Sequence, residues 1–244
     1  MFELYQDNYI LPYYYTVNPY YSLYNQMSVE NEPVESKEFK AQLSVYAPIY
    51  EWEHISLNAA FTLKSFWQLY EIRPWFRSSD YNPEAFVLYK INGNNKASIG
   101  YSHESNGLGT NYEMSWNRVY GKYNYDQKDF SFEFMAWILP VDNETTFTHH
   151  SEKIENYLGY EKITGSYRIG DFETKVSIQN IENIDRIQIT ASQSYNFYRD
   201  YSLYFQYFYG YGQSLLEFNH FTQAFGIGIQ FLNNEKNKEC NCPK

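Results

Sequence analysis

The chain has 244 residues and only two cysteines, both near its C-terminus, so no disulfide framework spans its body. A net charge of −10 and a sequence pI near 5.0, with no basic cluster, argue against nucleic acid as a partner. The mean hydropathy is −0.63, and no apolar run approaches the roughly 18 residues that a transmembrane helix needs, which excludes a helical membrane protein.

Segments in which apolar residues alternate with polar or small ones recur along the chain, beginning at residues 8–16. Leu43, Val45 and Ala47 show this period of two, and so do residues 187–191 and 225–231. Many of the segments reach about 10 residues or more, the length of a tilted membrane strand rather than of a soluble one. The long segments are 54–69, 115–126, 129–139, 157–168, 184–195 and 201–211.

About twelve such segments are joined by short polar turns, a pattern typical of up-and-down hairpins. Alternation alone is equally compatible with a soluble β-sandwich. Aromatic residues make up 21% of the chain, including 28 tyrosines and 18 phenylalanines, and this abundance favours a membrane barrel with aromatic girdles. The predicted fold is therefore all-β, a twelve-stranded antiparallel transmembrane β-barrel, with no helical segment.

We expect one barrel domain over residues 1–232 and a polar C-terminal tail over residues 233–244. Residues 17–41 are polar and predict a long loop. The first residues lack the basic and apolar regions of a secretory signal peptide. Because the remaining segments indicate an exported barrel, we expect the mature form of a bacterial outer-membrane protein.

A candidate catalytic pair lies where one predicted strand ends: His103 and Ser105 are two residues apart. Side chains at positions i and i+2 of a strand share one face. Counting back along the chain, Ile99 and Tyr101 occupy the same face. A base and a hydroxyl are thus predicted at the end of an apolar stripe.

The next strand-like segment, residues 115–119, can bring Asn117 alongside this pair, on the face that it shares with Val119. The Asn117 amide would supply a third polar group to orient the His103 imidazole. An imidazole, a hydroxyl and an amide on an apolar surface indicate a hydrolase whose substrate is itself apolar.

These residues resemble the signature of the outer-membrane phospholipase A family. The signature consists of His103, Ser105 and Gly107, followed by the block Ser115–Arg118. The resemblance covers roughly residues 5–232 and includes the further blocks Lys64–Leu69, Phe76–Arg77, Tyr81–Glu84 and Gly210–Leu216.

The resemblance implies a twelve-stranded barrel that catalyses calcium-dependent hydrolysis of phospholipid acyl esters, a phospholipase A1/A2, and that is controlled by reversible homodimerisation. It assigns Ser105 as nucleophile and His103 as general base, with Asn117 in place of the usual triad aspartate. It also assigns an oxyanion hole to the backbone N–H of Gly107, helped by the bound calcium.

The same resemblance implies how Ca2+ would be held. The ligands would be the backbone carbonyl of Leu108, the side chain of Glu113, and a carbonyl from the partner subunit at the position of Arg73. Two of these positions depart from the family pattern. Glu113 is a carboxylate where the family has a hydroxyl, and the segment around Arg73 is shorter than in the family.

Other candidate groups favour ordinary surface roles. His149 and His150 lie in a polar loop and predict solvated surface rather than a metal site. Asp142 and Glu144 in that loop are a weak candidate for auxiliary calcium binding. The Cys240-x-Cys242 pair lacks the spacing of a redox dithiol motif.

Two rival functions are compatible with these patterns. A barrel without catalysis would act as a pore or adhesin, for which we expect a wide polar lumen. A soluble β-sandwich that binds lipid would fold without detergent.

Overall fold

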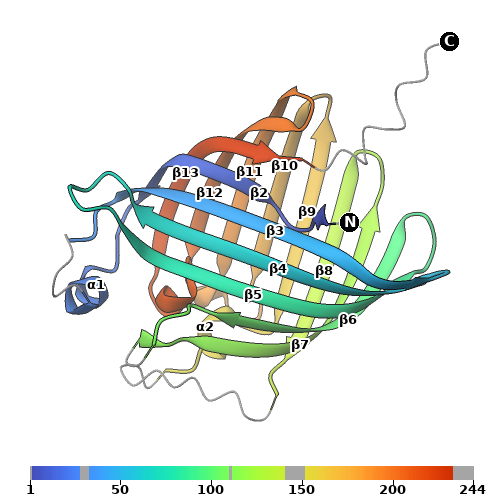
Figure 1. Ribbon diagram of the computed structural model, residues 1–244, viewed down its shortest axis with the longest axis horizontal. Coiled ribbons are helices and arrows are strands. Elements are labelled where there is room, and N and C mark those ends of the chain that lie inside the picture. Colours follow the sequence, from blue (N-terminus) through green and yellow to red (C-terminus); the bar gives the residue numbers. More distant parts are fainter. Residues whose placement is uncertain (1, 28–32, 110–111, 141–151, 233–244) are drawn as a thin grey trace.

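The computed structural model describes residues 2–27, 33–109, 112–140 and 152–232. It is an antiparallel β-barrel (Figure 1). The strands are β1 (Glu3–Leu4), β2 (Asn8–Thr16), β3 (Lys37–Trp52), β4 (Ile55–Gln68), β5 (Trp75–Lys90), β6 (Asn95–Ser105), β7 (Ser115–Asp126), β8 (Phe130–Ile138), β9 (Glu161–Ile169), β10 (Phe172–Gln179), β11 (Gln188–Tyr198), β12 (Tyr201–Gly210) and β13 (Thr222–Phe231). The helices are α1 (Tyr21–Met27), α2 (Glu155–Leu158) and the short 3-10 turns η2 (Ile184–Arg186) and η3 (Leu215–Glu217).

Each strand from β2 to β13 pairs with the next one, and the pairing of β13 with β2 closes the ring. The two-residue strand β1 pairs with β3 beyond the part of β3 that pairs with β2, so it adds no further strand to the ring. The predicted twelve-stranded antiparallel barrel is therefore confirmed. A closed ring leaves no strand edge with unpaired backbone groups, which is the condition for crossing a membrane with strands.

The connections are short at one end of the barrel and long at the other. Turns such as residues 91–94 and 170–171 lie at the first end, whereas segments 17–36, 106–114 and 211–221 lie at the second. We call the second the long-loop end. β6 and β7 meet there, so the residues singled out from the sequence lie at this rim.

The faces of the strands are apolar outside and polar inside. In β4, Ser56 and Asn58 are buried in the barrel whereas Leu57 is 40% exposed; in β6, Ile99 is 63% exposed. This order suits a wall surrounded by lipid and is the reverse of a soluble β-sandwich, whose apolar faces meet. The sandwich alternative is therefore wrong.

A buried ion cluster fills the lumen at the long-loop end. The Arg77 guanidinium makes two bonds to the Glu38 carboxylate, at 2.7 and 3.0 Å, and one of 2.7 Å to Glu217. Arg77 Nη1 also donates to the Tyr24 hydroxyl at 3.0 Å. All four side chains are buried. One cation thus joins β3, β5, η3 and α1.

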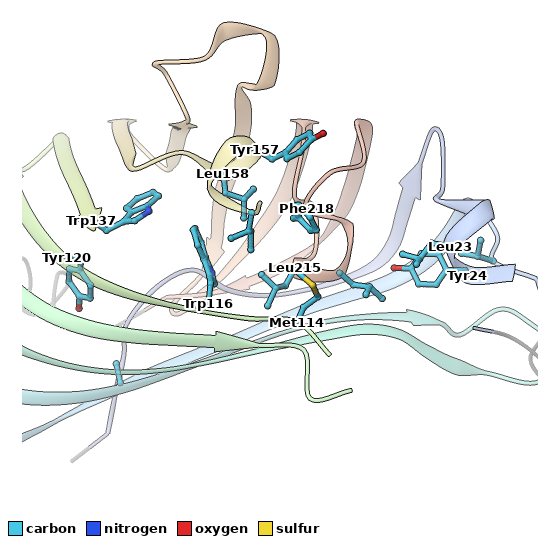
Figure 2. Packing of buried hydrophobic residues seen from close by; sticks show 14 of the residues in the cluster. Leu23, Tyr24, Met114, Trp116, Tyr120, Trp137, Tyr157, Leu158, Leu215 and Phe218 are labelled. Atoms are coloured by element: carbon cyan, nitrogen blue, oxygen red, sulfur yellow. The ribbon is translucent and has the colours of Figure 1, made fainter. Parts of the chain in front are cut away.

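An apolar cluster that includes Tyr24 brings residues of α1, α2 and η3 together at the long-loop end (Figure 2). Leu158 of α2 and Leu215 of η3 lie in the same cluster as Trp116 of β7. The backbone N–H of Leu215 donates to both carboxylate oxygens of Asp80, at 3.2 and 3.1 Å, which ties η3 to β5. The long-loop end is therefore a packed cap.

Two helices depart from the prediction of an all-strand chain. Residues 17–41 contain α1 and the start of β3 rather than a continuous loop. The stretch predicted as a strand over 157–168 begins with α2, and β9 starts only at residue 161. Ile154, Tyr157 and Leu158 are buried at helical spacing of three and four, so the cap selects a helix there. No helix among the described residues is long and apolar enough to cross a membrane.

We predict that Arg77→Met lowers the free energy of unfolding by about 3–5 kcal/mol, because it leaves two carboxylates buried without their cation. Urea unfolding in lipid, followed by tryptophan fluorescence, measures the change. The matched control is Arg168→Met, which breaks a partly exposed pair with Glu173 and should stay within about 1 kcal/mol. Equal effects of the two substitutions would contradict the role assigned to the cluster.

Candidate active site

The candidate site lies on the outer wall of the hairpin formed by β6 and β7. The register pairs His103 directly with Asn117, and Ser105 with Ser115. His103 and Ser105 share the outward face with Ile99 and Tyr101, while Ser102 on the other face is buried in the lumen. The hairpin therefore carries an imidazole, a hydroxyl and an amide on the wall that faces lipid.

His103 and Asn117 are joined by a hydrogen bond of 2.8 Å between His103 Nδ1 and Asn117 Oδ1. An amide oxygen only accepts, so the Nδ1 atom carries the proton in this pairing. The neutral imidazole then has an unprotonated Nε2 atom, the form required of a general base. Asn117 thus selects the tautomer of His103.

Ser105 is the last residue of β6, two positions beyond His103 on the same face. The hydrogen bonds within the described residues do not include one between Ser105 and His103. The structure therefore brings His103 and Asn117 into contact and places Ser105 next along the same stripe.

The lumen side of the hairpin is cross-linked directly behind the site. Glu104, between His103 and Ser105, accepts hydrogen bonds from Trp116 Nε1 at 3.0 Å and from Arg118 Nη2 at 2.9 Å. The Arg118 guanidinium also lies 4.3 Å from the centre of the Trp116 ring. These contacts join β6 to β7 on the lumen side and fix the backbone that carries the outward side chains.

Asn106 organises the segment that follows Ser105. Its side chain is buried and accepts from the N–H of Leu108 at 3.2 Å and of Met114 at 3.0 Å, while Nδ2 donates to the Tyr112 carbonyl at 2.7 Å. One side chain thus holds both ends of the 106–114 segment.

Gly107 has a φ of +64°, a left-handed conformation that glycine adopts without steric cost. A Cβ atom built on Gly107 would lie 2.9 Å from Cε2 of Tyr81, which pairs with Ser105 from the neighbouring β5. Both the backbone and the neighbouring ring therefore require glycine next to the candidate nucleophile.

The proposed calcium ligands have donor chemistry that fits the ion. The Leu108 carbonyl and the Glu113 carboxylate are hard oxygen donors on the segment that Asn106 holds. Glu113 is exposed and forms no ion pair within the described part of the chain. Arg73 lies elsewhere, exposed in the 69–74 connection between β4 and β5.

The described residues show no second metal site. Across the ranges that the structure describes, no three His, Cys, Asp or Glu side chains gather as a metal site. The loop residues Asp142, Glu144, His149 and His150 lie outside the described residues, and so do Cys240 and Cys242 with the rest of the predicted tail.

Sequence reasoning missed two residues of the site. Tyr101 appeared only as part of the apolar stripe, but its hydroxyl donates to Asn117 Oδ1 at 2.6 Å. The sequence did indicate that Tyr101 lies on the same face of the strand as His103. Tyr81 appeared only within the block Tyr81–Glu84, and the spacing of that block did not indicate its contact with Gly107.

Comparisons with known proteins place the chain and its fold among phospholipases. The family model for phospholipase A1 matches residues 1–231. Phospholipase A1 of Escherichia coli (strain K12) is 29% identical over 242 residues, covering 88% of this chain and 81% of that protein. Phospholipase A1 of Proteus vulgaris is 27% identical over 241 residues, with 92% and 79% covered.

Solved structures agree with these sequence matches. The Salmonella typhi outer membrane phospholipase (OMPLA) dimer with bound calcium superposes with a TM-score of 0.85 at 25% identity, covering 95% of this chain and 92% of that one. Outer membrane phospholipase A from Escherichia coli gives a TM-score of 0.83 at 25% identity, covering 95% and 91%.

We predict that Gly107→Ala lowers the free energy of unfolding by about 1–2 kcal/mol, since an L-residue at positive φ is strained and the new methyl meets Tyr81. Chemical unfolding of the refolded barrel measures it. Gly109→Ala, in the same segment with open space around its Cβ, should change the stability by less than about 0.5 kcal/mol. If both glycines tolerate alanine equally, the steric argument fails.

Proposed function

Because the chain belongs to the phospholipase A1 family, we propose that it hydrolyses phospholipid acyl esters with Ser105, His103 and Asn117 as its catalytic triad. It is a phospholipase of the bacterial outer membrane, like the relatives that share its barrel. The observation that supports the triad most directly is the 2.8 Å bond between His103 and Asn117 on the lipid-facing wall.

The reaction begins with attack of the Ser105 hydroxyl on the ester carbonyl. His103 Nε2 takes the hydroxyl proton during the attack and returns it to the departing lysolipid oxygen. Asn117 holds the Nδ1–H and so keeps Nε2 in the basic form. Water then hydrolyses the acyl-enzyme with the same base.

The amide of Asn117 is neutral, so it stabilises the imidazolium less than a carboxylate would. The leaving group of an ester is an alkoxide, which needs less assistance from the base than the amine leaving group of a peptide does. A carboxylate on this outer wall would also carry a charge towards lipid, which is costly. The asparagine therefore suits both the substrate and the position.

The backbone N–H of Gly107 is the proposed donor to the oxyanion. Its left-handed conformation re-aims the backbone immediately after Ser105, and Asn106 fixes the segment that carries it. A preorganised N–H stabilises the developing negative charge without reorganising during the reaction.

The Leu108 carbonyl and the Glu113 side chain would hold Ca2+, with the carbonyl of Arg73 supplied by a partner subunit. Bound calcium would supply positive charge that stabilises the developing oxyanion. Glu113 brings a full negative charge to this shell, which favours binding of a hard divalent cation.

A reversible homodimer is the proposed active form. The triad lies on an open outer wall whose neighbours, such as Ile99 and Tyr101, are exposed. A single wall cannot enclose long acyl chains, whereas a second apolar wall facing it makes a cleft. The related Salmonella typhi enzyme is a dimer with bound calcium.

The pore alternative is disfavoured by the buried charges at the long-loop end of the lumen. Arg77, Glu38 and Glu217 are each no more than 3% exposed, and the apolar cap packs beside them. A steady wide channel would require these charges to separate and hydrate.

We predict that Ser105→Ala abolishes calcium-dependent fatty-acid release from phospholipid in mixed micelles, by at least about a thousandfold, because the nucleophile is lost. Ser115→Ala is the matched control, since Ser115 pairs opposite Ser105 and should retain activity within about threefold. Release that survives Ser105→Ala, or none from the folded unsubstituted barrel, would favour the pore or adhesin reading.

We predict that Glu113→Gln raises the calcium concentration for half-maximal activity by about tenfold, because a charged ligand becomes neutral. Cross-linking in the same titration should show dimer formation shifted to the same extent. Glu182→Gln, an exposed carboxylate at the same barrel end, should shift neither curve. An unchanged calcium dependence in Glu113→Gln would remove Glu113 from the ligand set.

A further inference from the structure

Two donors converge on a single oxygen atom in the site. Asn117 Oδ1 accepts from His103 Nδ1 at 2.8 Å and from the Tyr101 hydroxyl at 2.6 Å. Tyr101 pairs with Val119 across the hairpin, so Asn117 is its diagonal neighbour, within reach of a tyrosine side chain. An amide oxygen has two lone pairs and can satisfy both donors.

We propose, on the basis of the triad assigned above, that Tyr101 is a positioning residue of the reaction: its hydroxyl fixes the Asn117 amide so that the oxygen faces His103. Tyr101 acts through Asn117 and has no contact with the reacting atoms.

The need for such a residue follows from the difference between asparagine and aspartate. A carboxylate presents an oxygen whichever way it turns, whereas an amide rotated by 180° presents its NH2 group. That group would donate to His103 Nδ1, so the imidazole would carry its proton on Nε2. Nε2 could then not accept the proton of Ser105.

The tyrosine hydroxyl opposes this rotation. In the rotated state it could only accept from the amide, and its own proton would need another acceptor on a wall that faces lipid. An unpaired donor in apolar surroundings is costly. The observed orientation satisfies both the Tyr101 proton and the His103 proton with one oxygen.

The same hairpin contains a matched control. At its opposite end, the hydroxyl of Tyr123 donates to Asn95 Oδ1, again across β6 and β7. Tyr123 is 38% exposed and Tyr101 is 45% exposed, both on the outer wall. Tyr123→Phe therefore removes an equivalent hydroxyl from an equivalent bond, far from the triad.

The test compares Tyr101→Phe with Tyr123→Phe. Both should fold with closely similar unfolding midpoints, because each loses one hydroxyl at an exposed position. In Tyr101→Phe we expect kcat for fatty-acid release to fall about three- to tenfold, the effect of one net hydrogen bond, with KM unchanged. Tyr123→Phe should leave both constants unchanged.

A double-mutant cycle with Asn117→Ala separates positioning from general support of the hairpin. In the Asn117→Ala background, Tyr101→Phe should have no further effect on residual kcat, because the group that it positions is absent. Equal losses in both backgrounds, or full activity of Tyr101→Phe, would overturn the proposal. Failure of the triad itself is distinguished by Ser105→Ala, which would then remain active.

Discussion

A residue in a strand of a closed barrel has only two environments available, lipid outside or lumen inside, and its parity decides between them. Lipid offers no hydrogen-bond partners, so the outer wall must be apolar. The lumen of a narrow barrel must then satisfy every charge that faces it from within the protein. Both requirements are visible in β6, where Ile99 faces outward while Ser102 and Glu104 face inward. The candidate triad places polar groups on the apolar side, and that exception is where we propose that the chemistry lies.

The inward charges connect separate elements of the barrel at the long-loop end. Arg77 holds two carboxylates and a tyrosine hydroxyl from separate elements, and Asp80 holds the backbone of η3. These contacts connect segments that are far apart in the chain. The outer wall can therefore display a small polar site without needing that site for stability.

The fold was readable from the sequence because period-two alternation and segment length both act locally. Parity also placed His103, Ser105 and Asn117 on one face. Helix α1 was not predicted because the polar residues around it indicated a loop, and α2 was not predicted because its aromatic residues resemble strand residues. Only the packing of the cap selects the helical spacing of Ile154, Tyr157 and Leu158.

The contacts within the site were harder to predict from the sequence than its position in the barrel. Parity assigned the Tyr101 side chain to the apolar outer wall. It gave no indication that the hydroxyl of that side chain donates to Asn117. The block that contains Tyr81 was visible in the sequence, but the packing of Tyr81 on Gly107 depends on the register between β5 and β6, which the sequence pattern does not give.

The imidazole and the amide that it pairs with are only 14 positions apart, and a single hairpin brings them together. Closing so short a stretch of chain is far less demanding than completing the ring of strands. The contact between His103 and Asn117 therefore needs no strand other than β6 and β7. On the proposal made above, the host's own lipids are protected until two barrel walls meet, because that meeting supplies both the cleft for the acyl chains and the partner's ligand to calcium.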